Sequence, residues 1–220
     1  MRLWGKILAF ALCAALAHGV AGAAKTDGHG AAAAPQGAPA RYRLDASRST
    51  FTVRAFSGGV FWFKGHDHLV AARDFTGEAT LTPGSVNPAS LRLTVRAASL
   101  AETRDVFTEQ QKQIINKELR EIVLEPDKYP EITFQSTGVE AKAEGGVFEV
   151  RLTGDLTLHG VTRRVTIPAD VTVAGEDLRA RGEFHIERSD FNVKATSAFH
   201  GTVRVRDKLK VMFDIVARRI

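Results

Sequence analysis

The sequence predicts an all-β domain, mainly antiparallel, whose sheet curls around an apolar interior and carries one helical insertion. The first observation is a strict alternation of apolar and polar side chains over residues 148–158, interrupted on its apolar side only by Gly154. A period of two is that of a β-strand with one buried and one solvated face. The second observation is that about eight or nine such runs, mostly joined by short turns, fill the chain. This pattern is typical of an up-and-down barrel or a related sandwich.

The expected strands follow this alternation along the chain. They lie at residues 42–44, 50–56, 75–81, 91–97, 132–134, 148–158, 165–173, 178–186, 203–205 and 209–215. Pro83-Gly84 ends one run in a turn, and Gly175-Glu176-Asp177 is typical of a hairpin turn. Pro168 lies inside a run, and because proline has no N–H to donate we expect an edge position or a bulge there.

One segment, residues 103–123, has a helical period instead. Its apolar residues recur at spacings of three, four and seven: Phe107, Ile114, Ile115, Leu119, Ile122 and Val123. Thr108 and Gln111 match a capping box, and Pro126 and Pro130 follow the segment. The helix is long enough to cover one opening of a barrel, and the pattern leaves open whether it plugs the core or moves as a lid.

The first 40 residues have a different composition from the rest. Residues 1–23 resemble a cleaved signal peptide, with Arg2 and Lys6 before a short apolar run and small residues at positions 21–23. An uncleaved amphipathic anchor is the alternative. Residues 24–40 are rich in Ala, Gly and Pro and are predicted to be a flexible linker. Residues 41–220 then form one domain, and we expect a periplasmic or secreted protein.

Charge and cysteine content narrow the class of protein. The formal net charge is +5, and removal of Arg2 and Lys6 lowers it by two, to +3. The basic residues are spread over the polar faces of strands without exposed aromatic residues between them, which argues against nucleic-acid binding. The single cysteine, Cys13, lies in the signal segment, so the mature chain has no disulfide or thiolate chemistry.

Four stretches together resemble the YceI-like family of exported proteins. They are Tyr42-Arg-Leu-Asp45 with Ser49–Val53, Asp74–Gly77, Asp127–Phe134 and Gly154–Thr162. The resemblance implies an eight-stranded, up-and-down, lipocalin-like barrel with one helical insertion. It also implies an elongated apolar pocket for a polyisoprenoid, an isoprenoid quinone or a similar amphiphilic lipid. A membrane surface or a membrane redox protein is the partner it suggests, and a homodimer is left open.

The inward-facing residues are the expected ligand contacts, with no cofactor. The predicted ligand-binding set is Phe51, Val53, Phe61, Phe63, Phe75, Leu93, Val95, Phe134, Phe148, Val150, Leu156, Phe184 and Ile186. A polyisoprenoid chain presents only hydrocarbon, so it needs a dry lining and no catalytic groups. The alternative is that these side chains simply pack against one another, because eight strands enclose an interior that side chains can just fill.

Residues 60–69 depart from the family pattern. Phe61, Trp62 and Phe63 are consecutive, which is typical either of an apolar rim or of burial on both faces. In an extended chain His66 and His68 point the same way, so a metal- or haem-binding module, or a metal-dependent enzyme, is the alternative function. A third ligand would have to come from His159, His185 or His200.

Catalysis without a metal has no support in the sequence. Asp45, Asp74 and Asp155 are scattered, and Ser197 and His200 lack the context of a nucleophile elbow. We therefore expect a binding protein rather than an enzyme.

Overall fold

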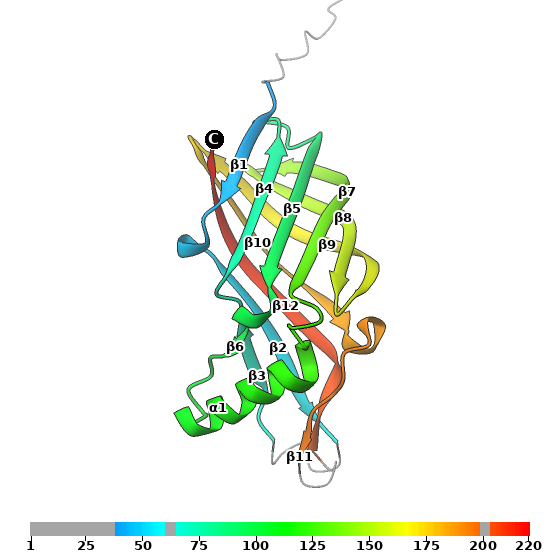
Figure 1. Ribbon diagram of the computed structural model, residues 1–220. Helices are drawn as coiled ribbons and strands as arrows, with labels where there is room; N and C mark the ends of the chain where they lie inside the picture. Colours follow the sequence, from blue (N-terminus) through cyan, green and yellow to red (C-terminus); the bar gives the residue numbers. More distant parts are fainter. Residues whose placement is uncertain (1–37, 60–64, 199–202) are drawn as a thin grey trace, which may run out of the picture. The chain divides into compact units, whose positions relative to one another are not determined.

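Eight antiparallel strands form a closed barrel in the computed structural model, which describes residues 38–59, 65–198 and 203–220 (Figure 1). The strand order around the ring is β1–β4–β5–β7–β8–β9–β10–β12, and pairing of β12 with β1 closes it. The bounds are β1 Ala40–Leu44, β4 Phe75–Leu81, β5 Ala89–Arg96, β7 Glu131–Glu144, β8 Val147–Leu158, β9 Val161–Ala174, β10 Asp177–Glu187 and β12 Val203–Arg219. The all-β, eight-stranded prediction is confirmed.

Four further strands extend the wall at one end of this ring. β2 (Thr50–Gly58) pairs with the first part of β12, β3 (His68–Ala71) pairs with β2, and β6 (Ala101–Glu102) pairs with β3. The short strand β11 (Ser197–Ala198) pairs with the start of β12. The register of β12 against β2 shifts between Val205 and Leu209, so β12 bulges where this extension begins.

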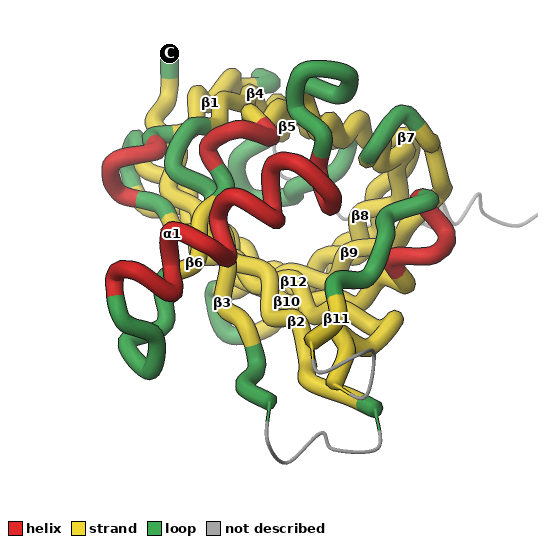
Figure 2. Tube along the Cα trace, turned by 60° about the horizontal axis from the view of Figure 1, so that its bottom comes forward, coloured by secondary structure: helices red, strands yellow, loops and turns green. Residues whose placement is uncertain are grey.

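The helical insertion lies across the same end (Figure 2). It consists of α1 (Glu109–Glu118) and the π-helix η4 (Leu119–Leu124). The predicted capping box is present: Thr108 Oγ1 accepts from the Gln111 N–H, and Gln111 Oε1 accepts from the Thr108 N–H. The helix begins later than residue 103, because the Glu102 carboxylate accepts the N–H groups of Thr103 and Arg104 and holds that stretch outside a helix.

The described part of the chain also contains three short 3₁₀ turns: η1 (Ala46–Arg48), η3 (Ala97–Ser99) and η5 (Arg188–Phe191). Among the described residues, no helix combines the length and apolar character needed to cross a bilayer. The predicted signal peptide, residues 1–23, and most of the predicted linker lie outside the described residues. Ala40, the last residue of that linker, is the buried first residue of β1.

The end of the barrel opposite the helix contains an apolar cluster of buried side chains, and we call it the filled end. Its side chains form one apolar cluster, in which Tyr42 and Ala217 are completely buried: Tyr42, Leu81, Val150, Val171, Leu178 and Ala217. A second cluster, which includes Phe75, Val95 and Phe134, fills the middle of the barrel. The gap that Gly154 leaves in its strand is occupied by the Phe134 ring, which a Cβ at Gly154 would strike.

Pro168 lies where one strand loses a neighbour, as predicted. β9 pairs with β10 only over residues 170–174, whereas residues 161–169 pair with β8 alone. The missing N–H of Pro168 therefore costs no hydrogen bond of the ladder with β10. Below this point β9 and β10 are separated by the segment that begins with η5, whose Phe191 and Val193 are buried in the central core.

Two of the sequence motifs meet at the β8–β9 turn. His159 and Gly160 both have positive φ, 51° and 73°, as a two-residue hairpin turn requires. The Tyr129 ring packs on His159 with centroids 4.2 Å apart, and His159 Nε2 lies 3.0 Å from Glu125 Oε2. A Cβ at Gly160 would stand 2.7 Å from the Tyr129 ring, so only glycine suits this position. The contact ties the end of η4 to the barrel.

Candidate functional site

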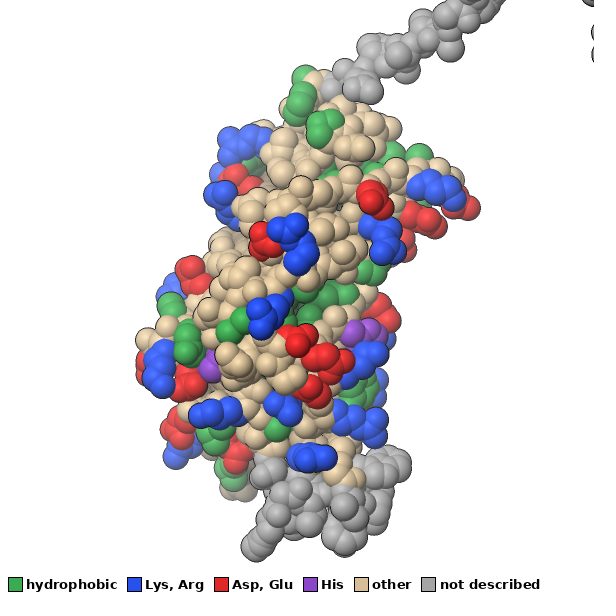
Figure 3. Space-filling view, turned by 90° about the vertical axis from the view of Figure 1, so that its right-hand side faces the viewer, with side chains coloured by type: hydrophobic (Ala, Val, Ile, Leu, Met, Phe, Trp, Pro, Cys, Tyr) green, Lys and Arg blue, Asp and Glu red, His purple; other side chains and the backbone are tan. Residues whose placement is uncertain are grey.

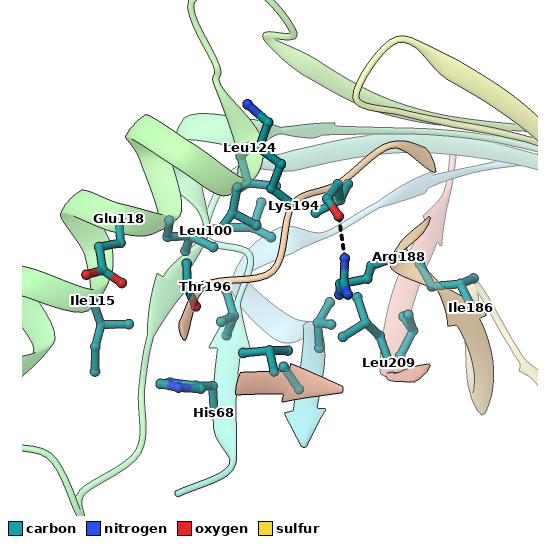
Figure 4. A pocket seen from close by; sticks show the side chains of 18 of the residues that line it. His68, Leu100, Ile115, Glu118, Leu124, Ile186, Arg188, Lys194, Thr196 and Leu209 are labelled. Atoms are coloured by element: carbon teal, nitrogen blue, oxygen red, sulfur yellow. Dashed lines mark hydrogen bonds between the residues drawn. The ribbon is translucent and has the colours of Figure 1, made fainter. Parts of the chain in front are cut away.

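A cavity of about 500 Å³ occupies the end of the barrel that the helix covers, and we call this the hollow end (Figure 4). Its wall is mostly apolar, with contributions from β2, β3, β10 and β12: Phe51, Val53, Val70, Phe184, Ile186 and Val211. Several residues of the central core, among them Val95 and Leu156, also form part of this wall. The size and the apolar lining are those of a small-molecule binding site.

The structure brings six of the thirteen predicted ligand-binding residues to this cavity: Phe51, Val53, Val95, Leu156, Phe184 and Ile186. Five others are not part of the lining. Phe75, Leu93 and Phe134 belong to the central core, and Phe148 and Val150 to the filled end. Phe61 and Phe63, like Trp62, lie outside the described residues.

Whether a predicted ligand-binding residue lines the cavity depends on its position along its strand. β8 runs through both ends, so its inward row includes Val150 in the filled end and Leu156 in the cavity wall. Both side chains are buried, and both obey the same period of two. Alternation therefore identifies the inner face but not the level at which the interior becomes hollow.

The helix supplies lining residues that strand periodicity could not indicate. Ile114, Ile115, Leu119 and Val123 come from α1 and η4 and face the cavity. Their spacing in the sequence predicts an apolar stripe on one face of a helix. In the structure this stripe forms part of the cavity wall. Ile114 is nevertheless 61% exposed, so the cover over the cavity is partial.

A buried carboxylate lies beside the cavity and was not singled out from the sequence. The Glu102 side chain is fully buried, and its Oε1 accepts the N–H groups of Leu69, Thr103 and Arg104 at 2.8–3.2 Å. Burial raises the pKa of this carboxyl, but the bonds from His68 and from those N–H groups outweigh it, so the pKa lies below its ordinary value. Glu102 is thus an anion that fixes β3, β6 and the segment before α1.

His68 is oriented by this carboxylate. Its Nδ1 lies 2.8 Å from Glu102 Oε2, and its ring stacks on Phe107 with centroids 5.3 Å apart. The His66 and Phe107 rings are nearly perpendicular, with centroids 5.7 Å apart. Both histidines line the cavity, so they bring polar nitrogen atoms to an otherwise apolar wall.

The predicted metal ligands are not joined by a third. Within the described ranges, no group of three or more His, Cys, Asp or Glu side chains is placed to hold a metal ion. His159 is bonded to Glu125, His185 is exposed on β10 opposite Lys210, and His200 lies outside the described residues. The metal- or haem-binding alternative therefore finds no donor set in the part of the chain that is described.

The closed antiparallel barrel, with one filled end and one hollow apolar end, defines a lipocalin-like binding fold. The chain belongs to the YceI-like domain family, whose sequence profile matches residues 42–217. The resemblance seen in the sequence motifs is thereby confirmed.

Proteins from several bacteria share part of this sequence. Protein YceI of Escherichia coli O6:H1 is 35% identical over 130 residues, which cover 56% of this chain and 61% of the relative. A UPF0312 protein of Photorhabdus laumondii is 32% identical over 165 residues, covering 71% and 77%. The match to the YceI proteins thus spans less than two thirds of their length.

Solved structures support the fold. BcnA of Burkholderia cenocepacia superposes with a TM-score of 0.61 at 23% identity, covering 79% of this chain and 98% of BcnA. A polyisoprenoid binding domain from Saccharophagus degradans gives a TM-score of 0.54 at 14% identity, covering 81% and 98%. At these identities the likeness concerns the fold alone.

Proposed function

We propose that this protein binds one polyisoprenoid, isoprenoid quinone or similar long-chain amphiphile in its hollow end, and that it acts as a carrier rather than as an enzyme. The observation that carries the proposal is the apolar cavity of about 500 Å³ beneath the helix. The similar fold of the polyisoprenoid binding domain from Saccharophagus degradans supports the choice of ligand class.

The chemistry of the wall matches a hydrocarbon tail. Aliphatic and aromatic side chains from strands of the barrel and from the helical insertion surround the space, so a tail would contact carbon on nearly every side. Each CH₂-sized unit transferred from water contributes about 0.8 kcal/mol. A chain of several isoprene units therefore gains enough free energy for tight binding without any polar contact.

Export to the periplasm is part of the proposal, and it rests on the signal-like pattern of residues 1–23. A carrier in that compartment would exchange its ligand with a membrane surface or a membrane protein. The exposed Ile114 and Ile122 of the helix lie at the hollow end, where such an exchange would take place.

The direct test is native mass spectrometry of the freshly purified protein, combined with organic extraction of its contents. We expect one bound amphiphile per chain, or uptake of one added polyprenol or long-chain quinone. A protein that stays empty and takes up neither probe would contradict the proposal.

A pair of substitutions shows whether the cavity is the site. Ala55→Trp places a large ring at a position that lines the cavity, whereas Ala143→Trp adds the same ring at an exposed position of β7 outside it. We expect Ala55→Trp to lower uptake at least tenfold and Ala143→Trp to leave it unchanged. Equal uptake by both variants would place the ligand elsewhere.

A further inference from the structure

A second hollow adjoins the cavity and is unusually basic. Three of the described residues that line it are arginines, Arg188, Arg204 and Arg206. Two of them, Arg188 and Arg204, also line the apolar cavity, as does Val205. The two spaces therefore meet at one wall, which is formed by the start of η5 and the start of β12.

On other parts of the barrel, several arginines are paired with acids. Figure 3 shows basic and acidic side chains interspersed over one face, and the ion pairs Arg164–Asp155 and Arg179–Asp214, at 2.8 and 2.6 Å, lie on neighbouring outer strand positions. Such exposed pairs neutralise each other locally. In the second hollow, by contrast, three arginines lie beside one acid, Asp207, among the described lining residues.

The guanidinium groups there keep free donors. Arg188 Nη1 donates to the Val193 carbonyl at 2.8 Å, but its Nε is buried and has no hydrogen-bond partner among the described residues. Figure 4 shows this side chain reaching between the segment of Lys194 and Leu209. Arg206 uses Nε to reach the Ser57 carbonyl at 2.8 Å. Within the described ranges the Arg204 guanidinium makes no hydrogen bond or ion pair.

The acids nearby do not neutralise this cluster. Asp207 is the acidic residue in the described lining of the second hollow, and its two oxygens accept from the N–H and the hydroxyl of Ser189 at 2.9 and 2.6 Å. Its Oδ1 also forms an ion pair with Arg188, 3.7 Å from Nε, at a distance too long for a hydrogen bond. Glu118 lines the apolar cavity from α1 and is exposed. Three cations thus share one carboxylate that is already bonded.

We propose that this hollow binds the anionic headgroup, a phosphate or a carboxylate, of an amphiphile whose tail lies in the cavity. The inference rests on the proposed function and narrows its ligand class from neutral to acidic amphiphiles. A guanidinium presents its N–H groups as a fork that matches the oxygens of phosphate and carboxylate. The bulge of β12 between Val205 and Leu209 brings Arg206 and Asp207 to the same hollow.

The test compares three probes on the same protein: farnesyl phosphate, farnesol and inorganic phosphate. Isothermal titration should show farnesyl phosphate binding at least about tenfold more tightly than farnesol, with a preference that shrinks as salt is added. Inorganic phosphate should bind far more weakly than farnesyl phosphate, because it has no tail. If it binds equally well, the hollow is a site for free anions and not for a lipid headgroup.

Arg204→Gln is the decisive variant, because it removes a charge without breaking a contact of the described structure. It should lower the affinity for farnesyl phosphate about tenfold more than the affinity for farnesol, because only the phosphate loses a charged partner. Arg151→Gln, the same change at an exposed position of β8, should alter neither affinity. Arg188→Gln should act like Arg204→Gln, but it also removes the bond to Val193.

The two proposals fail in distinguishable ways. If farnesol and farnesyl phosphate bind the unmodified protein equally well, the headgroup site is refuted and the carrier function stands. If Arg204→Gln and Arg188→Gln both fold and both keep the full preference, these arginines are not the headgroup site. If neither prenyl probe binds, the carrier function itself is contradicted.

Discussion

The two ends of the barrel share one pattern of alternation and have opposite interiors. At the filled end, Tyr42 and Ala217 leave no exposed surface, whereas at the hollow end Phe51 and Val53 line a cavity of about 500 Å³. The difference lies in what closes each end. Strand-to-strand packing closes the filled end, and a helix that contributes side chains from one face only covers the hollow end. We therefore expect the filled end, which has no cavity residues, to contribute more to the free energy of unfolding than the hollow end.

The largest expected contrast is between two phenylalanines. Phe134→Ala removes a ring that is 2% exposed and packs over Gly154, so we expect a loss of about 3–5 kcal/mol in the free energy of unfolding. Phe51→Ala removes a ring that already faces the cavity, and we expect about 1–2 kcal/mol because it creates little new empty space. Urea denaturation followed by circular dichroism measures both values.

Equal losses for these two variants would contradict the distinction between a solid core and a hollow end. A loss for Phe51→Ala above that for Phe134→Ala would reverse it. Lipid uptake is a second measurement that separates the two variants. Only Phe51→Ala should change uptake, because only Phe51 lines the cavity.

The next effect concerns the anion that organises the hollow end. Glu102→Gln keeps an acceptor for the backbone N–H groups but replaces a charged bond to His68 by a neutral one. We expect a loss of about 2 kcal/mol in the free energy of unfolding. Glu144→Gln, at an exposed position of β7, is the matched control and should change stability by less than about 0.5 kcal/mol.

The same carboxylate predicts a pH dependence that distinguishes the two ends. Because the pKa of Glu102 is lowered in the folded state, its contribution is complete above the unfolded-state pKa of about 4.3. It is lost as the pH falls through the lower folded-state pKa. NMR should show the amides of Leu69, Thr103 and Arg104 shifting in that acid range while amides of the filled end stay in place. Identical behaviour in the Glu102→Gln variant would assign the titration to another group.

A smaller effect is expected where the helix is tied to the barrel. Gly160→Ala introduces a Cβ at φ 73°, 2.7 Å from the Tyr129 ring, and should cost about 1–2 kcal/mol. Gly145 has a similar φ of 58°, and no atom lies within 4 Å of the position of a new Cβ. Gly145→Ala therefore measures the cost of the positive φ alone. Thermal melts of the two variants should differ. Coincident melts would show that the contact with Tyr129 carries no stability.

The smallest effect probes the filled end. The Tyr42 hydroxyl is buried and finds no hydrogen-bond partner in the described part of the chain. Tyr42→Phe removes this polar atom and keeps the ring, so we expect stability to rise by up to about 1 kcal/mol. Chemical denaturation is the measurement. A marked loss would mean that the hydroxyl contributes a favourable interaction.

By itself, the sequence determined the all-β fold, the inward rows of the strands, the capped helix and an interruption of normal pairing at Pro168. These features depend on neighbours along the chain, because side-chain alternation, a capping box and the missing N–H of proline are local properties. The same local information placed Val150 and Leu156 in one inward row. This local information does not give the distance across the barrel, either at Val150 in the filled end or at Leu156 in the hollow end.

Only the tertiary structure decided where the interior is hollow and which polar groups meet there. Glu102 reaches the N–H of Leu69, which is 33 positions earlier, and the arginines of β12 meet Arg188 through a bulge. Such contacts depend on strand register and on how the wall closes, and these are settled when distant segments pack together. The inner face is thus a property of the chain, whereas the cavity is a property of the closed barrel.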